Sequence, residues 1–214
     1  MPILRAVLLA ACVALAGCAT PPPPPRDKSA LAFDETSPDA LVVVGFAVDA
    51  PASAINVSMT WTCHNPETGA ICPKRDPDGP KNMFGVSQRF LGFGLVKDRA
   101  RSTEAFETIE RNVLRVPPGD YILDDAHRVD FVLGGYPSWT TKYADRDRTS
   151  ADTKAPRFRA TPGKAHYLGD FRLQFFGNPA KIQRTMDLAA AQRELETYPN
   201  VRGRLAPVTL KSEN

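Results

Sequence analysis

His127 is the histidine with the most carboxylates close to it in the sequence, and it is the first candidate for catalytic chemistry. Asp124, Asp125 and Asp130 surround it, and an imidazole beside a carboxylate is a common pair in general acid–base catalysis. His127 also continues the apolar alternation of its own segment, which is typical of a hydrogen-bonded histidine in or beside a core. We favour this structural role and predict no catalytic residue.

Metal chemistry has little support in the residue spacing. No two histidines have the His-x-x-x-His spacing that places two ligands on one helical face, and His166 falls on the polar face of its predicted strand. Asp145 and Asp147 open like a calcium loop, but Ser150 replaces the turn glycine and Pro156 stands where the bidentate Glu belongs. We interpret this segment as a solvated loop and predict neither a metal nor any other cofactor.

Two glycine-containing segments match known motifs only in part. The segment that begins at Gly85 and contains Ser87 has Arg89 where a nucleophile elbow closes with glycine. Gly92 and Gly94 lack the third glycine and the following helix of a dinucleotide loop. The sequence therefore predicts neither a serine hydrolase elbow nor a nucleotide site.

Cysteine chemistry gives the most specific signal. After Arg5, the apolar run 6–16 is too short to cross a bilayer, which is typical of a secretory signal. The run ends in Leu15, Ala16, Gly17 and Cys18. This ending resembles the lipobox of bacterial lipoproteins, which implies removal of residues 1–17 and acylation of Cys18 with fatty acids such as palmitate. The alternative is an ordinary signal, cleaved at a small-residue site such as the one before Thr20, with Cys18 incidental.

The same resemblance implies a location. Several acyl chains hold a protein firmly in a bilayer, because each buried methylene contributes about 0.8 kcal/mol. The residue after Cys18 is Ala19 and not Asp, which in Gram-negative lipoproteins implies sorting to the outer membrane. We therefore expect a lipid-anchored protein whose folded domain faces the periplasm.

Three segments follow from this reading of the chain: a signal peptide (residues 1–17), a lipidated tether (18–38) and a folded domain (39–214). Pro21–Pro25 predict a polyproline II spacer that rises about 3.1 Å per residue, and residues 26–38 are expected to continue it loosely. A proline ligand for an aromatic groove is the alternative, but the position beside the anchor favours a stalk.

Cys63 and Cys72 are the two cysteines that remain in the mature domain, because Cys12 is lost with the signal and Cys18 is acylated. The compartment is oxidising, and Pro66 and Gly69 let the chain reverse between them. We predict a disulfide. The alternatives are two buried free thiols, or a metal site that includes His64.

The pattern of apolar residues predicts an all-β fold. The run 41–48 is almost continuously apolar, as in a strand buried on both faces, and Val57, Met59 and Trp61 alternate with polar residues expected to face water. Segment 103–116 suits a helix or a strand, and we favour a strand. Two further strands are expected in segments 165–175 and 201–210, with Pro207 interrupting the second. Ala165, Tyr167, Phe171, Leu173 and Phe175 should share one face of the first of these two strands.

One helix is predicted near the C-terminus. Asp187 can cap it, Leu188, Ala191, Leu195 and Tyr198 fall on one face, and Pro199 ends it. Eight or nine short strands with one helix predict an antiparallel sandwich of two sheets. The segments 117–121 and 162–170 are similar to strand openings in poorly characterised bacterial lipoproteins with prealbumin-like or carboxypeptidase-regulatory-like sandwiches. That resemblance implies a fold and transfers no catalytic residue.

Composition narrows the function classes. The chain has 214 residues, a formal charge of +3 and no long basic block, which argues against a nucleic-acid partner. We predict a non-enzymatic module that is anchored in the membrane and binds or supports an envelope protein or peptidoglycan. A periplasmic hydrolase or a carbohydrate-binding module is the alternative, in which Trp61, Trp139 and Tyr143 could line a groove. For Trp61 we favour core packing, because its strand alternates regularly.

Overall fold

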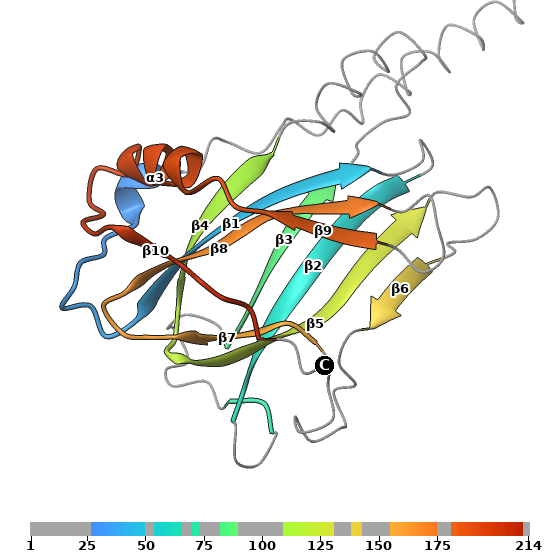
Figure 1. Ribbon diagram of the computed structural model, residues 1–214, viewed down its shortest axis with the longest axis horizontal. Helices are drawn as coiled ribbons and strands as arrows, with labels where there is room; N and C mark the ends of the chain where they lie inside the picture. The colour runs from blue at the N-terminus through green and yellow to red at the C-terminus, as the bar shows by residue number, and fades with distance from the viewer. Residues whose placement is uncertain are drawn as a thin grey trace, which may run out of the picture.

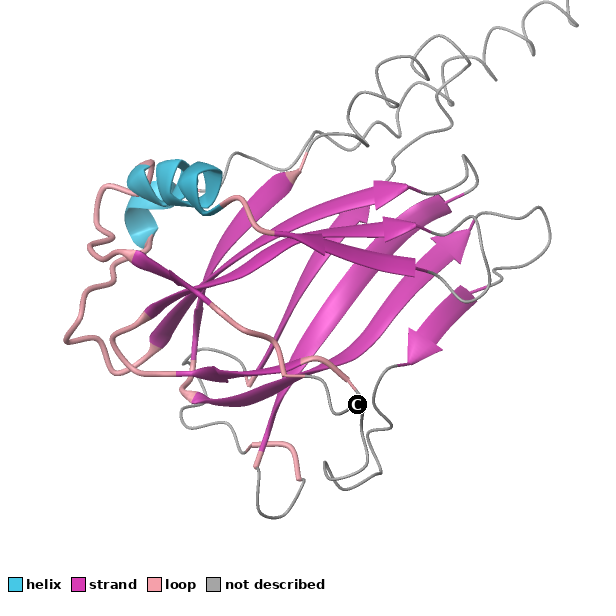
Figure 2. Ribbon diagram, viewed as in Figure 1, coloured by secondary structure: helices cyan, strands magenta, loops and turns pink. Residues whose placement is uncertain are grey.

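The computed structural model describes residues 27–49, 54–65, 70–72, 82–89, 109–130, 138–142, 155–174 and 181–211. Within them the chain forms two five-stranded sheets and a single α-helix, α3 (Leu188–Glu196) (Figures 1 and 2). The predicted all-β sandwich of two sheets with one short C-terminal helix is therefore confirmed.

The first sheet carries α3 on its outer face, and we call it the helix sheet. Its order is β4 (Glu110–Val116), β1 (Ala40–Asp49) and β8 (Ala165–Gln174). Two short strands then lie end to end along the free side of β8. β10 (Leu205–Pro207) pairs with its first half and β9 (Lys181–Thr185) with its second half (Figure 1).

The second sheet contains Cys63, one of the two disulfide cysteines, and we call it the disulfide sheet. Its order is β3 (Met83–Arg89), β2 (Ala54–His64) and β5 (Gly119–Asp130). The outer side of β5 is again covered by two short strands, β7 (Arg157–Ala160) on its first residues and β6 (Ser138–Lys142) on its later ones. The two sheets are thus built on the same plan.

Six of the eight pairings between described strands are antiparallel, and the pairs β1–β8 and β10–β8 are parallel. A tight turn forces antiparallel pairing only on the two strands that it joins. β1 and β8 are free to pair in parallel because all the strands of the disulfide sheet lie between them in the sequence. β1 is also the strand that the sequence predicts to be buried on both faces, as is usual for parallel strands. From Ala40 to Val44 every side chain is fully buried.

The main core lies between the sheets. Trp61 is fully buried there, with Phe84, Phe158 and Phe171 around it at ring distances between 5.5 and 6.3 Å. The predicted inner face of β2 is therefore confirmed, and Trp61 packs in the core as expected. The other face of β2 is not the wet surface that its polar residues predict, because Thr62 and His64 are also buried.

The alternation of side chains between the two faces of β8 reverses halfway along the strand. Gly169 has a positive φ of 103° at the position where the β1–β8 register shifts, and such a bulge adds one residue to one strand. Before the bulge, Tyr167 packs beneath α3, while Leu168 and, after the bulge, Phe171 point into the main core. The prediction that Tyr167 and Phe171 share one face was wrong, because the sequence alternation cannot reveal the extra residue.

The helix prediction is confirmed. α3 begins after Asp187, whose side chain accepts a hydrogen bond from the Ala190 N–H at 3.0 Å. Ala191 and Leu195 are buried on the helix sheet, together with Tyr198 just beyond the helix end. β4 and β10 confirm strands within segments 103–116 and 201–210, with Pro207 as the last residue of β10, where a missing N–H is tolerated.

Residues 27–37 pack against the domain, and we call them the N-terminal clip. Phe33 is 3% exposed, its N–H donates to Asn200 O at 3.1 Å, and the Arg202 N–H donates to Phe33 O at 2.8 Å. A short 3₁₀ helix, η2 (Lys28–Ala30), then lies beside α3, where Lys28 binds Glu194 at 2.8 Å (Figure 1). Residues 27–37 are therefore packed on the domain and do not form the loose continuation of the tether that the sequence suggests for them.

Candidate functional site

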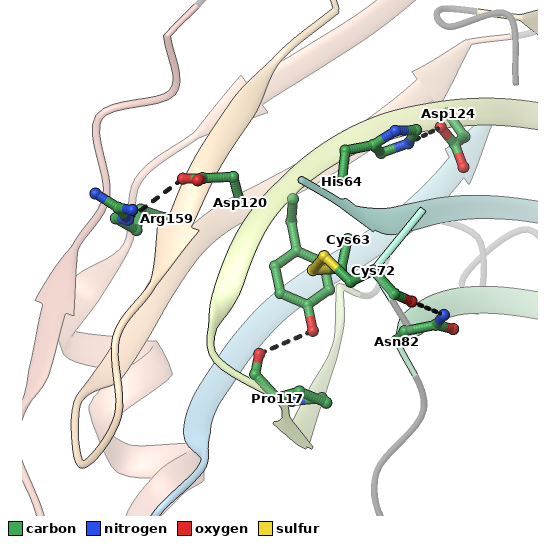
Figure 3. The surroundings of a disulfide bond; sticks show 9 residues. Cys63, His64, Cys72, Asn82, Pro117, Asp120, Asp124 and Arg159 are labelled. Atoms are coloured by element: carbon green, nitrogen blue, oxygen red, sulfur yellow. Dashed lines mark hydrogen bonds and ion pairs between the residues drawn. A yellow bond between two sulfur atoms is a disulfide. The ribbon is translucent and has the colours of Figure 1, made fainter. Parts of the chain in front are cut away.

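The Cys63–Cys72 disulfide links the end of β2 to the segment before β3, and its prediction is confirmed. The two Cα atoms are 5.4 Å apart, within the range a disulfide requires. Around it the chain forms a hairpin, because the Cys72 N–H donates to Cys63 O and the Asn65 N–H to Ala70 O, both at 2.8 Å. The Asn82 side chain donates to the carbonyl of Cys72 and ties the start of β3 to this hairpin (Figure 3).

The turn that enters β5 is shaped to receive the disulfide. A Cβ on Gly119 would lie 2.5 Å from Cys63 Sγ and 3.7 Å from Cys72 Sγ, so glycine is required for space. Two residues later, the buried Tyr121 hydroxyl donates to Pro117 O at 2.9 Å (Figure 3). This bond fixes the proline turn between the two sheets, in the manner of the tyrosine corner of other sandwiches.

His64 and Asp124 form a buried pair beside the disulfide. His64 Nε2 lies 3.4 Å from Asp124 Oδ1, and the two side chains are 3% and 2% exposed (Figure 3). Asp124 reaches His64 because the β2–β5 register shifts after Thr60, which leaves Asp124 without an opposite residue. Its second oxygen and the Thr62 hydroxyl have no hydrogen-bond partner within the part of the chain that the structure describes.

This pair has the residue types of acid–base catalysis but not the access. A general base must come within hydrogen-bond distance of the proton that it removes from a substrate, and both side chains are closed to solvent. The predicted grouping around His127 is only partly described. Asp124 turns to His64, while the side chains of Asp125, His127 and Asp130 lie outside the described residues.

His166 is a structural histidine that lies between the sheets, not on the polar face that the sequence predicts. Its Nε2 accepts the Thr161 N–H at 3.0 Å, and its ring lies 6.4 Å from that of Phe158. Burial lowers the pKa of His166 below its ordinary value, and the nearby Lys164 charge adds to the effect. The hydrogen bond needs the ring lone pair, so the imidazole is neutral in the fold and closes the turn from β7 to β8.

A second polar network lies under the start of α3. Arg111 binds Asp170 with two hydrogen bonds, from Nη2 at 2.6 Å and from Nε at 3.2 Å, and the Asp170 side chain is 1% exposed. The Tyr167 hydroxyl accepts the Asp187 N–H at 3.1 Å, and burial raises the pKa of Tyr167 to about 12. Asp170 packs directly on Gly45, where a Cβ would overlap its carboxylate. The network therefore joins β4, β8 and the cap of α3.

The sequence did not predict either polar network. The His64–Asp124 pair depends on a register shift between two strands that are distant in the sequence, and no local pattern marks it. The Arg111–Asp170 pair has a weak signal, since Asp170 is an acid within a strongly apolar strand. Such an acid needs a cationic partner if it is buried, but the sequence does not say which cation supplies it.

Several predicted residues lie outside the described ranges. These are Cys18, Tyr143, Asp145, Asp147, Gly92 and Gly94, with the side chain of Trp139. Ser87 belongs to a regular strand and not to an elbow. The described residues contain no group of three or more histidine, cysteine or acidic side chains placed to hold a metal. Nor do they include a helix long and apolar enough to cross a bilayer.

The two polar networks and the disulfide thus each join strands or turns within the fold. Comparison with known proteins adds no assignment to this geometry, since no family model, no curated protein and no solved structure matches the chain.

Proposed function

We propose that this protein is a bacterial envelope lipoprotein, held in the outer membrane by acylated Cys18, whose periplasmic sandwich domain binds or supports another envelope component without catalysis. The observation that carries the proposal is the order of segments at the N-terminus. An apolar run ends in Leu15, Ala16, Gly17 and Cys18, and five prolines begin three residues later, at Pro21. The sandwich domain follows, with its first strand at Ala40–Asp49.

The disulfide supports export from the cytosol. Disulfides persist in oxidising compartments such as the periplasm and are rare where thioredoxin and glutathione keep thiols reduced. Cys63 is 1% exposed and Gly119 leaves space for its sulfur, so the bond is built into the fold. A disulfide built into the fold in this way fits an oxidising compartment.

The chemistry of the described histidines supports a non-catalytic role. His166 is committed to the Thr161 N–H, and His64 is buried against Asp124. Neither imidazole is placed to exchange a proton with a bound molecule. The described polar groups instead stabilise the sandwich, which leaves its surface to carry the function.

Acylation is tested by replacing Cys18 with serine in the full-length chain. Growth with a labelled palmitate analogue should label the parent and not the Cys18→Ser variant, which should also leave the membrane fraction. A variant that still takes up label and still sediments with membranes would contradict the proposal. Ala19→Asp provides the test of sorting, since it should move the acylated protein from the outer to the inner membrane.

The partner class is tested by crosslinking in the intact envelope, followed by identification of the attached species. We expect a defined envelope protein or peptidoglycan fragment with the acylated parent. Release of a processed sugar or peptide from purified peptidoglycan would instead indicate a hydrolase, and would contradict the non-catalytic role.

A further inference from the structure

Because residues 27–37 pack on the domain, at most residues 18–26 are left for the proposed tether, fewer than half of the residues that the sequence suggests. Residues 18–26 are nine residues, which span about 28 Å at about 3.1 Å each in the polyproline II form. A tether that continued to residue 38 would span about 65 Å by the same arithmetic. A globular domain of this size has a radius of gyration of about 16 Å and is about 40 Å across.

These lengths decide which surface can approach the membrane. A tether of about 65 Å would let any face of a 40 Å domain touch the bilayer, whereas one of about 28 Å cannot pass around the domain. The near surface is therefore the one where the clip enters the fold. It comprises residues 27–37, the C-terminal half of α3, the α3–β10 connection and the β7–β8 turn, which packs against Glu35 through Gly163, and we call it the clip surface.

The clip surface carries cations without acidic partners. Lys164, Arg193, Arg202 and Arg204 are all exposed, and among the described residues none of them forms an ion pair or other polar side-chain contact. Lys164 and Arg204 immediately precede the paired residues of β8 and β10. Two cations in such neighbouring positions repel each other unless an anion lies between them.

The same surface also carries acids, of which Glu194 has a cationic partner. Glu194 binds Lys28, while Asp27 and Asp34 accept hydrogen bonds from Ser29 and Thr36 in local turns. The remaining acids near the clip are Glu35 and Glu196. Arginine is the side chain best suited to bind a phosphate through two parallel hydrogen bonds, so the uncommitted groups of this surface fit phosphate-bearing headgroups.

We propose that the clip surface is the membrane-facing surface of the domain, and that its arginines bind phospholipid phosphates while the outer face of the disulfide sheet faces away. This inference rests on the proposed acylation of Cys18.

The test uses the acylated mature chain in vesicles of phosphatidylethanolamine and phosphatidylglycerol. A photoreactive benzoylphenylalanine replaces Glu196 on the clip surface or, as a control, exposed Ser87 on β3 of the disulfide sheet. The measurement is the yield of protein–lipid adduct by mass spectrometry. We expect a yield at least about fivefold higher at position 196, the ratio that corresponds to about 1 kcal/mol from one arginine near an anionic surface.

Substitution of the arginines tests the chemistry. With the probe at position 196, Arg193→Gln, Arg202→Gln and Arg204→Gln together should lower the adduct yield at least about fivefold. Arg159→Gln should leave it unchanged, since Arg159 lies on β7 and its side chain is 75% exposed. Equal adduct yields at positions 196 and 87 would overturn the inference. So would a yield at position 196 that the three arginine substitutions leave unchanged. The mass of the N-terminal peptide reports acylation separately, so an unmodified Cys18 would refute the proposed function instead.

Discussion

Single glycines and histidines determine how the polar regions of this sandwich close. Gly119 and Gly45 are both positions where a methyl group would collide with a buried functional group, the disulfide in one case and the Asp170 carboxylate in the other. His166 uses a ring nitrogen to satisfy a turn N–H. The role of these three residues is structural.

Gly119→Ala should destabilise the oxidised protein by about 1 to 3 kcal/mol, because the added methyl overpacks against Cys63 Sγ. The free energy of unfolding from urea titration measures the effect. The matched control is the same substitution in a Cys63→Ala/Cys72→Ala background, where the sulfur atoms are absent. The cost should fall there by at least about 0.5 kcal/mol, and an equal cost in both backgrounds would show that the collision is not its source.

The stability of the protein should depend on the charge of His166. The pKa of His166 is lowered in the fold from 6.5, so the unfolded chain binds the proton more readily. Its contribution to stability is complete above about pH 6.5 and is lost as the pH falls towards the folded pKa. His166→Gln keeps a hydrogen-bond acceptor without a charge. Between pH 7.5 and 5 the parent should therefore lose more unfolding free energy than the variant, and parallel pH profiles would contradict this assignment.

At the scale of elements, sequence periodicity predicts the buried face of a strand when that face depends on the strand's own residues and not on its pairing with a neighbouring strand. β1 and the inner face of β2 were predicted, because an unbroken valine run and a strict alternation each specify burial directly. The faces of β8 were not, since the Gly169 bulge is a property of its pairing with β1. The N-terminal clip was also missed, because Phe33 is a lone aromatic among polar residues and its site is formed by Val201 and its neighbours.

The buried groups of the candidate site follow the same rule. The disulfide could be predicted because cysteine count and compartment leave one pair. The His64–Asp124 contact could not, because it requires the register of two strands about sixty residues apart. The sequence of this chain therefore predicts the disulfide, but it does not predict side-chain contacts between distant strands.

The N-terminal clip should be held mainly by Phe33 and only weakly by its ion pair. Phe33→Ala should cost about 3 to 5 kcal/mol, since the ring is 3% exposed in the cluster beneath α3. Lys28→Gln should cost less than about 1 kcal/mol, because Lys28 and Glu194 are 38% and 30% exposed and water screens the pair. Chemical denaturation measures both, and similar costs would contradict this division.

For the whole molecule, the boundary of the folded unit has a direct consequence for truncation. A chain that begins at residue 27 keeps the N-terminal clip, whereas one that begins at residue 39 exposes the apolar cluster around Leu41, Tyr198 and Leu205. The shorter chain should be less stable by at least about 3 kcal/mol and should show faster amide hydrogen exchange in α3. Equal stability of the two chains would show that the clip is dispensable.

The paired short strands at the side of each sheet limit edge-to-edge association between copies of the protein. β10 and β9 along β8, and β7 and β6 along β5, divide these borders into brief segments. A border divided in this way offers no continuous row of free N–H and C=O groups for a neighbouring molecule to extend. Lipid anchoring would confine all copies to a thin layer and raise their local concentration. If the protein is anchored as we propose, these two borders would hinder crowded neighbours from joining into fibrils.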